Sequence, residues 1–203
     1  MSGFFFVIFV MMEEIKPLEA GKIYHIYNRG VNSNVLFFES NNYSYFIKLY
    51  NKHINPIAET YAWCLMKNHF HFLVKIKTEE ENKSKNKISP SQSFSNLFNA
   101  YTKAFNKTYG RHGPLFERPF RRKEIKYRKY LQNVIAYIHN NPVNHKICAD
   151  PFDYSWSSYL TCLTNKPTKL ERSKVLSLFN DIEHFKQLHQ ESKNINILDD
   201  YWD

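Results

Sequence analysis

The succession of predicted strands and helices places the chain in the α+β class, as a ferredoxin-like or RRM-like antiparallel sheet with helices on one face. Two observations predict this fold. Four segments rich in β-branched and aromatic residues read as strands, and two segments with apolar residues at helical spacing lie between them. The order strand-helix-strand-strand-helix-strand is that of the split β-α-β arrangement, here followed by an extra C-terminal helix. The 203 residues suit one domain, with no internal repeat.

The first half of the chain supplies three strands and one helix. Residues 23–29 (IYHIYNR) alternate and predict the first strand, and residues 41–53 carry apolar side chains at helical spacing, with Asn or Ser available as the cap. Residues 60–66 (TYAWCLM) and 69–76 (HFHFLVKI) predict two further strands. The Lys67–Asn68 pair between them indicates a tight turn, so these two strands form a hairpin.

The polar segment 77–93 predicts a mobile loop, and a helix follows over 94–109 until Gly110–Pro114 breaks it. Residues 120–127 (FRRKEIKY) predict a fourth, strongly basic strand.

The next helix is predicted over 128–141, because Pro142 has no N–H and restricts the residue before it. From there the chain is irregular to about Tyr159. A last helix occupies part of 173–191.

Three parts are expected along the chain: an N-terminal extension (1–20), the main domain (21–160) and a C-terminal helical tail (161–203). The extension contains the apolar run Phe4–Met12, which is shorter than the roughly 20 residues that span a bilayer. No basic residue precedes this run, so a signal peptide is a poor fit. A start codon placed too far upstream and a peripheral strand or tail both remain open as explanations.

Composition favours a nucleic-acid partner inside the cell. The formal net charge is +9, with 28 Lys and Arg against 19 Asp and Glu, and 17% of the residues are aromatic. A basic chain interleaved with aromatics favours a polyanion. Cys64, Cys148 and Cys162 have no CxxC spacing, which excludes a thiolate zinc site of that type and fits a reducing, cytoplasmic location.

His69 and His71 stand two apart on a predicted strand, so both imidazoles project from one face of the sheet and Phe70 from the other. Two neighbouring imidazoles can ligate one divalent ion. Taken alone, this spacing more often marks a half-exposed polar face than a metal site.

Tyr137 and Asn141 are four residues apart and share one helix face. The Tyr137 hydroxyl could point across to the sheet, and Asn141 offers an amide oxygen as a further metal ligand. A phenol with a reference pKa near 10 is a weak nucleophile, which a metal at the scissile phosphate would compensate. His139 and His145 are possible proton carriers nearby.

Two motifs carry a family resemblance. Residues 65–73 (LMKNHFHFL) resemble the LMxNHxHxL signature of the single-tyrosine HUH transposases, and residues 137–143 (YIHNNPV) resemble the YIHxNPV signature of the REP-associated branch. Flanking pieces agree in order, and the resemblance covers about residues 20–160. These pieces are Tyr24-His25 with Arg29, residues 113–116 (GPLF) with Arg118, and residues 154–159 (YSWSSY).

The resemblance implies the HUH endonuclease/transposase fold and a metal-dependent tyrosine transposase. His69 and His71 would bind Mg²⁺ or Mn²⁺, with Asn141 completing the site where relatives carry a glutamine. Tyr137 would attack single-stranded DNA beside a hairpin, giving a 5′-phosphotyrosine link and a free 3′-OH. One departure is residues 144–146 (NHK), where the family commonly has Arg-Ala-Gly; any DNA contact by that arginine is therefore in doubt.

A basic cluster around the fourth predicted strand, together with two residues of the first strand, is expected to contact DNA phosphates and to give salt-dependent affinity. Glu117 and Glu124 interrupt it. The predicted DNA-binding residues are Arg118, Arg121, Arg122, Lys123, Lys126, Arg29 and His25.

Two other functions stay open: a domesticated protein that binds hairpin DNA without cutting it, and an RNA-binding module with aromatics on its sheet. An intact Tyr137 with His69 and His71 favours catalysis, because a pure binder needs none of them. The resemblance leaves open whether the protein acts as a monomer or a homodimer.

Overall fold

The computed structural model describes residues 16–82 and 88–193. The run Phe4–Met12 and part of the predicted loop, residues 83–87, lie outside them. The elements follow the predicted order, with additional short helices. They are β1 (Ile23–Arg29), the 3₁₀ turn η1 (Val31–Ser33), α1 (Ser40–His53), β2 (Ala58–Leu65), β3 (His69–Ile76), α2 (Pro90–Tyr109), β4 (Arg121–Ile125), α3 (Arg128–Asn144), the 3₁₀ turn η2 (Pro151–Asp153), α4 (Tyr159–Leu163), α5 (Arg172–Leu176) and α6 (Ile182–Glu191).

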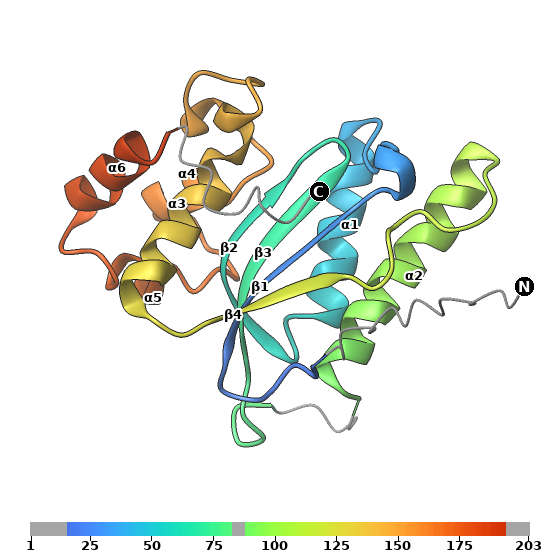
Figure 1. Ribbon diagram of the computed structural model, residues 1–203, viewed down its shortest axis with the longest axis horizontal. Coiled ribbons are helices and arrows are strands. Elements are labelled where there is room, and N and C mark those ends of the chain that lie inside the picture. Colours follow the sequence, from blue (N-terminus) through green and yellow to red (C-terminus); the bar gives the residue numbers. More distant parts are fainter. Residues whose placement is uncertain (1–15, 83–87, 194–203) are drawn as a thin grey trace, which may run out of the picture.

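The four strands form one antiparallel sheet in the order β2-β3-β1-β4, which confirms the ferredoxin-like topology. Helices α1 and α2 cover one face of this sheet, and α3 with the short C-terminal helices covers the other (Figure 1). The turn predicted at Lys67–Asn68 joins β2 to β3, where the Met66 amide donates to the His69 carbonyl at 2.8 Å. In the described ranges, no helix is long and apolar enough to cross a membrane.

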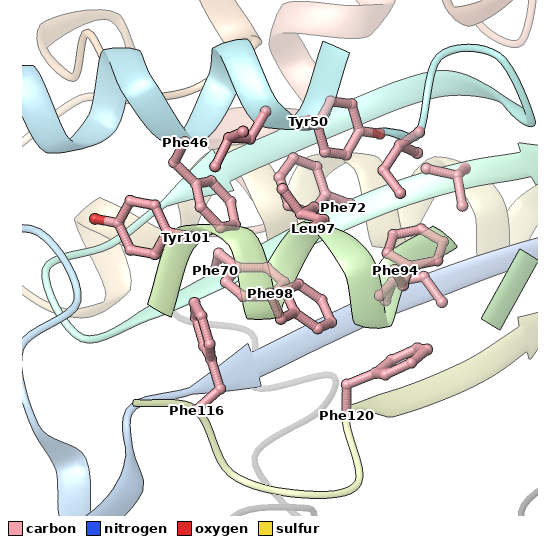
Figure 2. Packing of buried hydrophobic residues seen from close by; sticks show 14 of the residues in the cluster. Phe46, Tyr50, Phe70, Phe72, Phe94, Leu97, Phe98, Tyr101, Phe116 and Phe120 are labelled. Atoms are coloured by element: carbon pink, nitrogen blue, oxygen red, sulfur yellow. The ribbon is translucent and has the colours of Figure 1, made fainter. Parts of the chain in front are cut away.

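An aromatic core fills the space between the sheet and helices α1 and α2 (Figure 2). Phe46 of α1 lies at its centre with no exposed surface, and its ring centroid is 4.9 Å from Tyr101 of α2 and 5.4 Å from Phe70 of β3. The side chains at alternate positions of β3 point into this core, so the intervening histidines must face the opposite side.

Truncation of Phe46 is expected to be among the most destabilising core changes. Phe46→Ala would leave a cavity surrounded by rings that cannot collapse into it, at a loss of about 3–5 kcal/mol in the free energy of unfolding. Urea denaturation measures this loss. Phe152→Ala is the matched control, since Phe152 is 58% exposed; an equal loss in both variants would contradict the packing argument.

Helix ends differ from the predicted ones for local reasons. α2 begins at Pro90 rather than 94, because the Ser89 hydroxyl accepts from the Gln92 amide and proline suits the first helical position. α1 starts after Glu39, whose carboxylate forms a reciprocal capping box with Asn42, so the cap is not the predicted Asn or Ser.

The prediction that Pro142 ends its helix is wrong, since α3 continues through it to Asn144. The missing N–H removes one helical hydrogen bond, but Asn141 still accepts from the His145 amide at 3.0 Å. Asn141 and Pro142 are both buried, and their packing outweighs the local preference of proline. The helix predicted within part of 173–191 is α6, and a second short helix, α5, comes before it.

Candidate active site

His69 and His71 lie on β3 with their rings on the face that α3 covers. In the strand register His71 pairs with Tyr27 and His69 with Arg29 of β1. Both histidines are buried, at 8% and 1% exposure. Phe70 and Phe72 point the other way into the aromatic core, as the strand alternation predicts.

The side chain of Asn141, on α3, lies between the two imidazoles. Its Oδ1 is 2.9 Å from His69 Nε2, and its Nδ2 is 3.2 Å from His71 Nε2. Two Nε2 atoms from the strand and one amide from the helix therefore converge on one point. The three residues predicted as metal ligands are brought together.

The other ring nitrogen of each histidine also has a partner. His69 Nδ1 is 2.8 Å from Asn68 Oδ1, and His71 Nδ1 is 3.0 Å from His25 Nε2. Sequence reasoning missed both contacts. The signal for His25 was available, because the first and third strands are neighbours in this topology and His25 has the same parity as His71.

Tyr137 lies one helical turn before Asn141 and meets the histidines edge-on. Its ring centroid is 5.6 Å from that of His71 and 6.2 Å from that of His25, with interplanar angles of 83° in both pairs. The predicted nucleophile thus adjoins the predicted ligands. Tyr137 is buried, at 3% exposure.

Burial keeps the two histidines neutral. It lowers the pKa of His69 to about 4, against a smaller opposite effect of the Asn141 hydrogen bond, and it lowers the pKa of His71 well below its usual range. Neutral imidazole is the form that binds metals.

Two imidazole nitrogens and an amide oxygen make a donor set that suits a divalent ion such as Mn²⁺, with Mg²⁺ accepted more weakly at the nitrogens. Among the residues that the structure describes, no group of three His, Cys, Asp or Glu side chains is arranged to hold a metal. His25 is not placed as a ligand at the same point as the other two histidines. Its Nε2 contacts Nδ1 of His71, whereas Nε2 of His71 contacts Asn141. The side chain that lies between the two Nε2 atoms is the amide of Asn141.

The basic residues of β4 divide between the two faces of the sheet. Arg121 pairs with Tyr27 and Lys123 with His25, so both lie on the histidine face. Arg122 points to the other face, where it donates to Ser91 Oγ at 2.9 Å and lies over the Phe120 ring.

The remaining predicted DNA contacts are dispersed. Arg118 is exposed beside α2 and donates to Asn99, and Lys126 is exposed at the end of β4. Arg29 forms a 2.6 Å ion pair with Glu117. His25 is 1% exposed, so its placement favours an action on His71 over a contact with DNA.

The two histidines considered as proton carriers have different surroundings. The His145 ring centroid lies 5.0 Å from that of His69, at the rim of the site. His139 faces α6 instead, with its Nδ1 2.8 Å from His189 Nε2, and is buried. Its position supports a structural role.

No protein-family model matches this sequence, and no curated protein matches it. A search of solved structures finds a REP-associated tyrosine transposase bound to a REP hairpin, with a TM-score of 0.57 and 17% sequence identity. The match covers 77% of this chain and 89% of that chain. At this identity the likeness is one of fold: the chain has a four-stranded antiparallel α+β fold similar to that of this transposase.

Proposed function

We propose that this protein is a DNA transposase that cleaves and rejoins single-stranded DNA beside a hairpin, with Tyr137 as the nucleophile. The observation that carries the proposal is the convergence of Tyr137 and Asn141, from one face of α3, on His69 and His71 of β3. A binding protein needs neither a tyrosine at this place nor two buried neutral histidines.

The reaction assigned to Tyr137 is an in-line displacement at phosphorus. Its phenolic oxygen forms a bond to the phosphorus, the bond from phosphorus to the 3′ oxygen breaks, and that oxygen leaves as a 3′-hydroxyl carrying the proton that the phenol lost. The 5′-phosphotyrosine link preserves the energy of the cleaved bond, so a 3′-hydroxyl can later reverse the step. Strand and helix hold these groups more rigidly than loops would.

His69, His71 and Asn141 would hold the divalent ion, Mn²⁺ or Mg²⁺. When bound, the ion polarises the scissile phosphate and stabilises charge on its oxygens. The two histidines present their Nε2 atoms toward Asn141, and burial keeps them unprotonated at neutral pH.

His71→Ala is expected to remove the metal site. One of three protein ligands is lost, so Mn²⁺ affinity should fall by more than about 100-fold, beyond the loss typical of an outer-shell change. Isothermal titration with Mn²⁺ measures the affinity. Cleavage that survives EDTA, or normal activity in His71→Ala, would remove the metal from the proposed function.

Arg121 and Lys123 are placed to bind the phosphates of the substrate strand, since they share the histidine face. In the double variant Arg121→Ala/Lys123→Ala, hairpin DNA should bind more weakly, and the slope of log K against log salt should fall by about 1.4 for two single-strand phosphate contacts. Fluorescence anisotropy at several salt concentrations gives this slope. Lys186→Ala on α6, paired with Glu183, is the control and should leave it unchanged.

The substrate class is suggested by the structural neighbour, which is bound to a REP hairpin. To test the proposal, a labelled single-stranded hairpin oligonucleotide is incubated with the protein and Mn²⁺. A denaturation-resistant adduct is expected, and mass spectrometry should place the nucleotide on the peptide that contains Tyr137. Labelling of a different tyrosine would overturn the assignment.

Binding of hairpin DNA without cleavage is a second candidate function. It is favoured by one observation, the 3% exposure of Tyr137. Tight hairpin binding without any adduct, in the presence of Mn²⁺, would support this function over the first.

A further inference from the structure

The contact between His25 and His71 requires one proton between two nitrogens. His25 Nε2 and His71 Nδ1 are 3.0 Å apart and both rings are buried. If both nitrogens carried protons the contact would be repulsive, and if neither did there would be no hydrogen bond. When both rings are neutral, two arrangements are possible. Either His71 donates from Nδ1 and its Nε2 is an acceptor, or His25 donates from Nε2 and Nδ1 of His71 is the acceptor.

The neighbours of the pair select one arrangement. Asn141 Nδ2, a donor, lies 3.2 Å from His71 Nε2, which must then be the acceptor. The proton of His71 is consequently on Nδ1 and is donated to His25 Nε2. His25 in turn carries its own proton on Nδ1, a buried atom without a hydrogen-bond partner in the described part of the chain.

An unpaired buried N–H is unfavourable, and its presence indicates that the orientation of His25 is imposed by packing. The ring is stacked between Tyr27, at 4.7 Å between centroids, and His71, at 5.1 Å. The ring of Tyr137 closes the site edge-on. These contacts fix the plane of the His25 ring and the direction of its Nε2 lone pair.

We propose that His25 is a positioning residue that holds His71 in the Nδ1-protonated tautomer, so that the Nε2 lone pair faces the focus shared with His69 and Asn141. The inference rests on the proposed function, since a metal at that focus needs this lone pair.

The choice of an imidazole for this task has a chemical consequence. Metal-binding histidines usually donate their second N–H to a carboxylate, a carbonyl or water. A carboxylate here would add a negative charge beside the place where a DNA phosphate must arrive. A neutral imidazole accepts the same hydrogen bond without adding that charge beside Lys123, the neighbour of His25 in the strand register.

Two substitutions separate the hydrogen bond from the packing. His25→Phe keeps a flat ring between Tyr27 and His71 but offers no acceptor, so His71 is free to move its proton to Nε2. His25→Gln loses the ring but can place an amide oxygen near the position of Nε2. His53→Phe, at the end of α1 on the other side of the sheet, is the matched control.

Two measurements test the inference. Long-range ¹H–¹⁵N NMR of the metal-free protein reports the His71 tautomer, which should be Nδ1-protonated in the wild type, in His25→Gln and in His53→Phe, and mixed or Nε2-protonated in His25→Phe. Electron paramagnetic resonance titration with Mn²⁺ should show affinity reduced about 10- to 100-fold in His25→Phe. The loss in His25→Gln should be much smaller.

A wild-type His71 protonated at Nε2, or equal Mn²⁺ affinity in His25→Phe and wild type, would overturn the role of His25 and leave the tyrosine chemistry standing. Wild-type protein that neither binds Mn²⁺ nor forms an adduct would overturn the proposed function while the tautomer stays readable. If His25→Phe does not fold, the wild-type tautomer and the comparison with His25→Gln still decide the matter.

Discussion

Tyr137→Phe is expected to abolish the covalent DNA adduct while leaving hairpin binding within about 2-fold of wild type, because phosphate contacts supply most of the affinity. The substitution removes one oxygen and keeps the ring that lies edge-on to His71 and His25. The surrounding histidines face one another, Asn68 and Asn141. The second phenol near the site, Tyr27, has its ring stacked on His25 and His71 instead of edge-on to them. Denaturing gel electrophoresis of the labelled hairpin oligonucleotide measures the adduct.

A matched control for this variant lies on the same helix. Tyr130 is two turns before Tyr137, and its ring packs under Lys123. Tyr130→Phe should retain the adduct. An adduct of normal yield in Tyr137→Phe would reject the nucleophile assignment, and a loss of hairpin binding in step with the adduct would show that the variant damages the DNA surface instead.

The buried strands of the fold could be predicted closely from the sequence. The bounds of β1 and β3 are those predicted, because alternation of side chains between two different environments leaves a period-two pattern. The same alternation placed His69 and His71 on one face. Helix ends were less predictable. At Pro142 the local preference of proline to end a helix is overcome by the packing of Asn141 and Pro142, which the sequence does not reveal.

The site could be predicted in its parts but not in its contacts. A helix face carrying Tyr137 and Asn141 follows from four-residue spacing, whereas the partners of each ring nitrogen depend on which strands are neighbours. His25 was interpreted either as a DNA contact or as a structural residue, on a strand expected next to that of His69 and His71. Its burial against His71 favours the structural role.

The free energy of unfolding is expected to fall as the pH drops from 6.5 to about 4. The cause is a buried pair of histidines, His139 of α3 and His189 of α6, that are hydrogen-bonded to each other. His189 Nδ1 donates to the Phe185 carbonyl at 2.6 Å, so its Nε2 accepts from His139 Nδ1. His139 Nε2 is then left to accept from the Ser158 hydroxyl at 2.8 Å. Each ring is neutral in this series of hydrogen bonds. Protonation of His189 at Nε2 would place protons on both nitrogens of its contact with His139, and the contact would become repulsive.

The sign of the pH effect follows from the direction of the pKa shift. Burial lowers the pKa of His189 to about 4, while the hydrogen bond to Phe185 and the charge of Asp150 act weakly in the other direction. In the unfolded chain the value is near 6.5, so the unfolded state takes up a proton first and the stabilisation present above pH 6.5 is lost as the pH falls. The groups facing His189 are His139 from α3, Tyr159 from α4 and Asp150.

The expected loss from His189 alone is on the order of 3 kcal/mol between pH 6.5 and 4, a large part of the stability of an ordinary domain. Urea denaturation at pH 7, 6, 5 and 4.5 measures it. His189→Gln keeps an acceptor for His139 without titrating, so its stability should depend less on pH, by up to about 1.4 kcal/mol per pH unit. Gln187→Ala on the exposed side of α6 should parallel the wild type. Parallel curves for wild type and His189→Gln would mean that the buried pair does not govern acid stability, and the attachment of α6 to α3 would then have to rest on apolar packing around Phe185.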